Sequence, residues 1–106
     1  MYATIRRYTP KTPATKENID ALKRRIEENF VPIAQDIRGF HSYAVLNVGN
    51  KELFSINIFE NREGAAESTR RAAEFIQKDP LKDQLSKPEV FEGELLVLRE
   101  SGVGVR

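Results

Sequence analysis

The sequence predicts an α+β fold in which a four-stranded antiparallel sheet carries two helices on one of its faces. Three observations point to it. Two apolar, β-rich runs flank Gly49-Asn50, a pair of residues that suits a hairpin turn. A helical spacing of apolar residues precedes this hairpin, and a second one follows it. A further β-rich segment lies toward each end of the chain, so the predicted order is β-α-β-β-α-β.

The first strand is predicted over residues 2–8 (YATIRRY), because this run is β-rich and stops at Thr9-Pro10. A helix should follow, since six apolar residues recur at helical spacing and share one face: Ile19, Leu22, Ile26, Phe30, Ile33 and Ile37. Pro32 lies inside this pattern and has no N–H to donate, which predicts a kink or a break. Gly39 is expected to end the helix as a left-handed cap.

The central hairpin is predicted from strands at 40–48 and 52–59. A two-residue turn fixes its register, and the resulting pairs include Val48–Lys51, Ser42–Asn57 and Phe40–Phe59. Directly paired residues share a face of the sheet. One face would therefore hold Phe40, Ser42, Ala44, Leu46, Leu53, Ser55, Asn57 and Phe59. The other face would hold His41, Tyr43, Val45, Phe54, Ile56 and Ile58.

The second helix is predicted to begin after Asn61, a good N-cap residue. Its inner face is built mostly of small residues, so the helix can lie close to the sheet: Ala65, Thr69, Ala72 and Ile76. Asp79-Pro80 predicts a short helical turn through Leu85, and residues 89–99 the last strand. These elements form one ferredoxin-like domain over residues 1–100, with 101–106 as a C-terminal tail or an arm onto a dimer partner.

Both faces of the predicted hairpin are apolar, although two helices can cover only one face of the sheet. A monomer would leave the other face in water as a large apolar patch, which monomers rarely do. We therefore expect a homodimer, with an α+β barrel formed from two sheets that face each other. The expected interface residues are Tyr43, Val45, Phe54, Ile56 and Ile58.

Composition excludes several classes of protein. The chain has 106 residues, no Cys, no Trp and a single His, so thiol catalysis, cysteine–zinc sites and multi-histidine metal sites are ruled out. We expect no metal and no cofactor. The formal net charge of +1 and the poor match of Arg38-Gly39-Phe40 to an RNA-binding motif argue against nucleic acid as a partner. Apolar runs of four or five residues are too short for a membrane span, so a cytoplasmic location is expected.

Several local strings resemble the antibiotic biosynthesis monooxygenase-like family of dimeric α+β barrels. They are Phe30-Val31-Pro32-Ile33, then Arg38-Gly39-Phe40-His41-Ser42-Tyr43, then Phe59-Glu60-Asn61-Arg62-Glu63-Gly64-Ala65. The resemblance covers most of the chain. It implies a homodimer with a small-molecule pocket between each sheet and its own helices. Some members oxidise aromatic polyketides or degrade haem without a conventional redox cofactor, and others have no demonstrated activity.

The haem-degrading branch does not fit this chain, because those members place Trp where Phe59 stands and this chain has no Trp. The resemblance instead favours cofactor-independent oxidation of a hydrophobic, aromatic small molecule. The alternative is a non-catalytic module of the same fold that binds a small ligand or only forms a dimer. Oxygen consumption with a small hydrophobic molecule would separate the two.

Five residues are candidates for lining the pocket: Arg6, Tyr8, Ser42, Asn57 and Phe59. Of these, Asn57 or Arg6 could stabilise developing oxyanion charge. The two catalytic candidates are Asn57 and His41, the latter because its imidazole titrates near neutral pH. Each has a simpler interpretation. Ser42 and Asn57 could bond to each other, His41 and Tyr43 could line the dimer contact, and Arg6 could be an end-of-strand charge in water.

Overall fold

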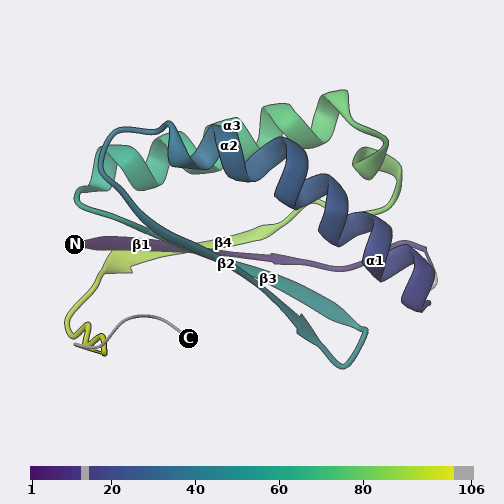
Figure 1. The fold of residues 1–106 in the computed structure, drawn as a ribbon, viewed down its shortest axis with the longest axis horizontal. Coiled ribbons are helices and arrows are strands. Elements are labelled where there is room, and N and C mark those ends of the chain that lie inside the picture. The colour runs from purple at the N-terminus through teal and green to yellow at the C-terminus, as the bar shows by residue number, and fades with distance from the viewer. Residues whose placement is uncertain (13–14, 102–106) are drawn as a thin grey trace.

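The computed structural model describes residues 1–12 and 15–101. Its elements follow the predicted order: β1 Tyr2–Tyr8, α1 Lys16–Arg25, the π-helix η1 Ile26–Phe30, α2 Val31–Gln35, β2 Phe40–Val48, β3 Glu52–Phe59, α3 Arg62–Lys78, the 3₁₀-helix η2 Pro80–Asp83 and β4 Glu89–Glu94. The strands form one antiparallel sheet of order β2-β3-β1-β4. Figure 1 shows α1, α2 and α3 on the same side of this sheet. The predicted fold class is confirmed.

The first helical segment changes its hydrogen-bond pattern just before Pro32. Thr15 caps α1 by accepting from the backbone N–H of Asn18 at 3.1 Å. In η1 the N–H of Val31 donates to the carbonyl of Ile26, a bond one residue longer than in an α-helix. Pro32 then lies in the first turn of α2, where its missing N–H is tolerated. The predicted irregularity at Pro32 is therefore a π-turn that joins two short α-helices.

The predicted hairpin register is wrong by one residue. The turn has positive φ at Gly49 and Asn50, as expected, but Val48 pairs with Glu52 and not with Lys51. A slip of one residue moves side chains to the opposite face. Tyr43 therefore pairs with Asn57, and Ser42 with Ile58. An irregularity between Phe40 and Ser42 restores the predicted Phe40–Phe59 pair.

The last strand is shorter than the predicted range 89–99. β4 ends at Glu94, whose partner is Tyr2 at the start of β1, and Leu95 donates to the carbonyl of Met1 at 2.9 Å. β1 begins at Tyr2, so the pairing of β4 with this strand ends at Glu94. Ser101 is the last residue described, so the expected tail or dimer arm at 101–106 falls almost entirely outside the described residues.

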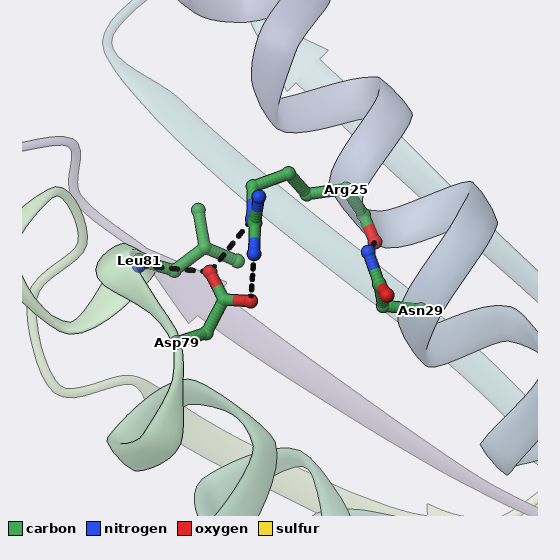
Figure 2. A network of polar contacts seen from close by, with 4 residues as sticks. All are labelled: Arg25, Asn29, Asp79 and Leu81. Carbon is green, nitrogen blue, oxygen red and sulfur yellow. Dashed lines mark hydrogen bonds and ion pairs between the residues drawn. The ribbon is translucent and has the colours of Figure 1, made fainter.

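The covered face of the sheet packs against the helices in adjoining clusters. Tyr8, Leu22 and Leu53 form one cluster with Leu81 and Leu85. Figure 2 shows the polar contacts that join α1 to the end of α3 beside this cluster. Asp79, at the end of α3, accepts from Arg25 of α1 at 2.6 and 2.8 Å and from the N–H of Leu81 at 3.1 Å. This contact ties α1 to the α3–η2 corner, and it places Leu81 in the core, where it is 1% exposed.

No described helix lies on the other face of the sheet (Figure 1). Pairing aligns Ala44, Ile56, Ile5 and Phe91 in one row across all four strands. Leu46 and Phe91 are 50% and 49% exposed. The open face therefore carries an apolar row from edge to edge, next to the ion pairs of Arg7 with Glu52 and Glu89. Among the described residues, no helix has the length and apolarity needed to cross a membrane.

Candidate functional site

The covered face holds a buried arginine at its centre. Arg6 lies on β1, which runs between β3 and β4, and α3 packs over it. Its side chain is 1% exposed. The guanidinium donates to Ser68 Oγ at 3.2 Å, to Thr69 Oγ1 at 3.1 Å and to Asn57 Oδ1 at 3.0 Å. Strand and helix thus hold one side chain in a fixed position between them.

The groups that accept from Arg6 are themselves held in place. Asn57, which is fully buried, donates through Nδ2 to the carbonyl of Thr4 and to Ser55 Oγ, both at 3.2 Å. Ser68 donates to the carbonyl of Ala65 at 2.8 Å. These bonds orient the acceptors toward the guanidinium. The arrangement is a preorganised cationic site.

Among the described residues, the charge of Arg6 has no carboxylate partner. Within residues 1–12 and 15–101, none of the ion pairs involves Arg6. Its Nε is buried and has no hydrogen-bond partner within these same ranges. Buried charges are normally paired, and a buried N–H without an acceptor is costly. An oxygen anion from outside the chain would meet both needs.

A cavity of about 40 Å³ lies next to Arg6, between the sheet and the helices. Arg6, Tyr8, Tyr43 and Ser55 contribute its polar groups, and the rest of the wall is apolar. Phe30 anchors this wall, with ring centroids 5.6 Å from Tyr43 and 5.5 Å from Phe75. The volume suits a few water molecules but no aromatic ring system.

Burial raises the pKa of Tyr43 and that of Tyr8, and the positive charge of Arg6 opposes both shifts. The net result leaves both phenols protonated at neutral pH. A protonated phenol can donate a hydrogen bond to an oxyanion. Tyr8, Tyr43 and Arg6 can therefore all act as donors at one end of the cavity.

A larger groove of about 320 Å³ adjoins the cavity on the side of α1 and β2. Ile26, Tyr43, Val45 and Leu53 line both spaces. These shared residues separate the two volumes, so their side chains must move for one ligand to occupy both. The combined space is of the size that small-molecule sites occupy.

The structure brings together some of the predicted pocket residues and separates others. Arg6 and Tyr8 line the cavity. Asn57 stands behind Arg6 as a support, outside the cavity lining, and Phe59 is fully buried against Phe40 at the other end of the sheet. The expected contact between Ser42 and Asn57 is wrong, because the register places Ser42 on the open face.

His41 lies outside the cavity lining as well. Its Nδ1 is 3.1 Å from Ser42 Oγ, and its Nε2 is 3.5 Å from Glu100 Oε1. The imidazole is therefore not positioned to act at the Arg6 end of the cavity.

The expected dimer residues also divide between the two faces. Phe54, Ile56 and Ile58 lie on the open face, whereas Tyr43 and Val45 lie on the covered face with Asn57 and Ser55. The prediction for Tyr43 and Val45 is thus corrected by the same one-residue slip. Their role changes from covering the outside of the sheet to lining the cavity and the adjoining groove.

Sequence reasoning missed Tyr43, Phe30 and Ser68 as parts of this site. Phe30 belonged to the predicted helix face, and Ser68 stands beside Thr69 on the small-residue face of α3. A polar residue next to an Ala-rich inner face was the available signal for Ser68. Over the described part of the chain, no three His, Asp or Glu side chains gather in a way that could hold a metal ion.

Comparison with known proteins identifies the fold of this chain. No protein-family model matches the sequence, and no curated protein matches it. Solved structures do match. A dimeric ferredoxin-like protein from an uncultured marine organism has a TM-score of 0.70 at 11% identity, over 94% of this chain and 98% of that one. SnoaB, a cofactor-independent oxygenase from Streptomyces nogalater, has a TM-score of 0.64 at 9% identity, over 92% and 94%.

A third match is the monooxygenase from the gene ActVA-Orf6 of Streptomyces coelicolor, solved with the ligand nanaomycin D. Its TM-score is 0.64 at 13% identity, over 93% of this chain and 92% of that one. Identities this low establish a common fold and leave activity open. The chain therefore shares the fold of antibiotic biosynthesis monooxygenase-like proteins, as its local sequence strings predicted.

Proposed function

We propose that this protein binds a small hydroxyaromatic molecule between its sheet and helices and oxidises it with dioxygen, without a cofactor. The observation that carries the proposal is the buried Arg6, which has no carboxylate partner among the described residues and an unpaired Nε beside the cavity. A similar fold serves cofactor-independent oxygenation in SnoaB, which supports the reaction type by analogy.

In this reaction the main role of the protein is to stabilise the negative charge of the substrate. The substrate hydroxyl loses its proton to solvent, and the resulting aryloxide is electron-rich enough to react with dioxygen. One oxygen atom replaces hydrogen on the ring carbon and becomes a quinone carbonyl. The other leaves as water with the two hydrogens that the substrate has lost, so the substrate supplies every electron. Arg6 would hold the aryloxide, with Tyr8 and Tyr43 as neutral donors.

Asn57 has a different role in this proposal. It contacts Arg6 at 3.0 Å and does not line the cavity, so it is a positioning residue. Asn57→Ala should lower turnover by loosening Arg6, while a substrate that binds mainly through apolar contacts keeps its KM. His41 has no part in the reaction.

A second candidate function rests on the size of the cavity. About 40 Å³ is too small for an aromatic substrate unless the groove beside α1 opens into it. If that wall is rigid, the protein is a non-catalytic module that binds small ligands in the groove or only forms a dimer. This alternative predicts no oxygen uptake with any hydroxyarene.

The working unit in this proposal is a homodimer in the cytoplasm. The apolar row from Ala44 to Phe91 crosses the whole open face, and a symmetric partner would cover it. A protein with this fold is known as a dimer. The interface would include Phe54, Ile56 and Ile58 and would leave the cavity on the opposite side of the sheet.

An oxygen electrode tests the proposed reaction. Purified protein would be offered 1-naphthol and anthrone, with quinone formation followed by absorbance. The proposal predicts one oxygen molecule consumed per substrate oxidised, and a loss of about 100-fold or more in turnover for Arg6→Met. Arg7→Met is the matched control, because Arg7 is the next residue of β1 and points to the other face. It should retain turnover within about twofold.

Two results would overturn the proposed reaction. The absence of uptake above the protein-free rate with both substrates would favour the non-catalytic alternative. Equal turnover in Arg6→Met and wild type would show that any oxidation takes place somewhere else.

A further inference from the structure

A second concave surface reaches Arg6 from the β4 side of α3. This groove, of about 460 Å³, lies between the second half of α3 and the segment that leads into β4. Arg6 and Tyr8 line it as well as the internal cavity, so both residues stand between the two spaces. We refer to it as the basic groove.

The charge of the basic groove is one-sided. Lys11, Lys82 and Lys87 line it together with Arg6, and no described Asp or Glu does. The three lysines are exposed, whereas Arg6 is 1% exposed. On a chain whose formal net charge is only +1, four basic groups around one concavity are a local concentration.

Backbone contacts fix the wall on which these groups stand. Lys11 donates to the carbonyl of Gln84 at 2.7 Å, and Ser86 donates to the carbonyl of Thr9 at 2.9 Å. Ser86 Oγ also accepts from the N–H of Thr9 at 2.8 Å. The segment before β4 is thereby bonded to the segment after β1. The groove is consequently a built feature of the fold, because Lys11 and Ser86, the residue before Lys87, are both held by backbone hydrogen bonds.

The remaining lining is mixed, with Thr69, Gln77 and Ser86 as its polar members. Among its apolar side chains, Ile76 comes from α3, Leu85 from the segment before β4, and Val90 from β4 itself. An inorganic anion would leave these side chains uncovered. An organic acid would cover them with its hydrocarbon part while its charge faced the lysines and Arg6.

We propose that the basic groove binds a small organic carboxylate with an apolar body. The carboxylate would pair with Arg6, whose buried Nε has no acceptor, and the lysines at the rim would attract it. A single carboxylate matches the single buried cation. Both proposals use the guanidinium of Arg6, but the basic groove shares no lining residue with the opening beside α1, and its three lysines line neither that opening nor the cavity, so the two can be tested separately.

Calorimetric titration with 2-naphthoate and its neutral analogue 2-naphthamide tests this proposal. The two probes have the same ring system and differ in charge. We expect naphthoate to bind at least tenfold more tightly than naphthamide in 50 mM NaCl, and its affinity to fall in 500 mM NaCl.

A pair of alanine variants on one helix locates the binding. Ala73 and Ala66 are both exposed residues of α3, but only Ala73 lines the basic groove. Ala73→Glu places a negative charge among the lysines and should weaken naphthoate binding tenfold or more. Ala66→Glu adds the same charge to the same helix and should change the affinity less than twofold. The double variant Lys82→Gln/Lys87→Gln should weaken binding several-fold.

Three results would overturn the inference: no heat of binding for naphthoate at 5 mM, equal affinities for the two probes, or unchanged affinity in both Ala73→Glu and the double lysine variant. None of them bears on oxygen uptake with neutral hydroxyarenes. A failure here is therefore distinguishable from a failure of the proposed reaction.

Discussion

Replacing Arg6 by Met should leave the protein almost as stable as wild type, although Arg6 is among the largest fully buried side chains of the chain. Three bonds from a charged donor, to Asn57, Ser68 and Thr69, would together stabilise the fold by about 5–9 kcal/mol. Against this, burying a guanidinium without a counter-ion costs several kcal/mol, and the unpaired Nε costs about 1–3 kcal/mol more. The opposing contributions nearly cancel.

Methionine keeps the length and the apolar stem of the side chain and removes the charge. Its main cost is Asn57 Oδ1, which loses its donor and stays buried, at about 1–3 kcal/mol. The free energy of unfolding of Arg6→Met should therefore lie within about 2 kcal/mol of the wild-type value. Arg6→Lys should be less stable than Arg6→Met, because a compact ammonium keeps the buried charge and cannot span the same acceptors.

Urea unfolding followed by circular dichroism measures these differences. All variants are compared at one protein concentration, because the apparent stability of a dimer depends on concentration. The reasoning would be refuted if Arg6→Met lost more than about 4 kcal/mol, or if Arg6→Lys proved the more stable variant. Either result would mean that Arg6 is kept for the stability of the fold. The predicted result would mean that a group with little net stabilising effect has another reason to be there.

Three further predictions concern the rest of the molecule. Burial raises the pKa of Tyr43 above its ordinary 10.0, so the unfolded chain loses that proton at a lower pH than the folded protein. The free energy of unfolding should therefore fall as pH rises above about 10. Tyr43→Phe should flatten this decline in urea titrations. The hydrogen bond from Arg25 holds the pKa of Asp79 below 3.8, so the carboxylate stabilises the fold fully above that pH and stops doing so as pH falls through its lower pKa in the folded protein. The free energies of unfolding of Asp79→Asn and wild type, plotted against pH, should therefore converge at low pH. Parallel curves would contradict this. Ile56→Glu puts a charge on the open face and should give a monomer in light scattering, whereas an unchanged dimer would place the interface elsewhere.

The fold was predictable because its signals agree with one another. Helical spacing, the turn at Gly49-Asn50 and the cap at Asn61 each indicate the same order of elements. Asn61 accepts from Gly64 N–H at 3.0 Å, as its place before the helix predicted. The end of β4 was not predictable from its own residues, because it depends on where β1 begins.

The site was harder to predict because its composition depends on the register. The hairpin has apolar residues on both faces, so the hydrophobic pattern could not tell a loop of two residues from one of three. That single residue decides whether Ser42 or Tyr43 faces Asn57. The burial of Arg6 was not predictable for a related reason. A charged residue in a strand suggests an exposed edge strand or strand end unless the strand order is known. β1 lies in the middle of the sheet, and α3 covers it.

Mapping of a neutral hydroxyarene by two-dimensional NMR would show whether the ligand site lies between sheet and helices beside Arg6. The protein would be titrated with 1-naphthol while the backbone amide signals are followed. We expect saturable shifts at residues that line the cavity and its opening, such as Ile26, Leu53 and Phe75, with loss of these shifts in Arg6→Met. Shifts confined to the open face around Ile5 and Ile56, or no saturable shifts at all, would contradict this placement of the site.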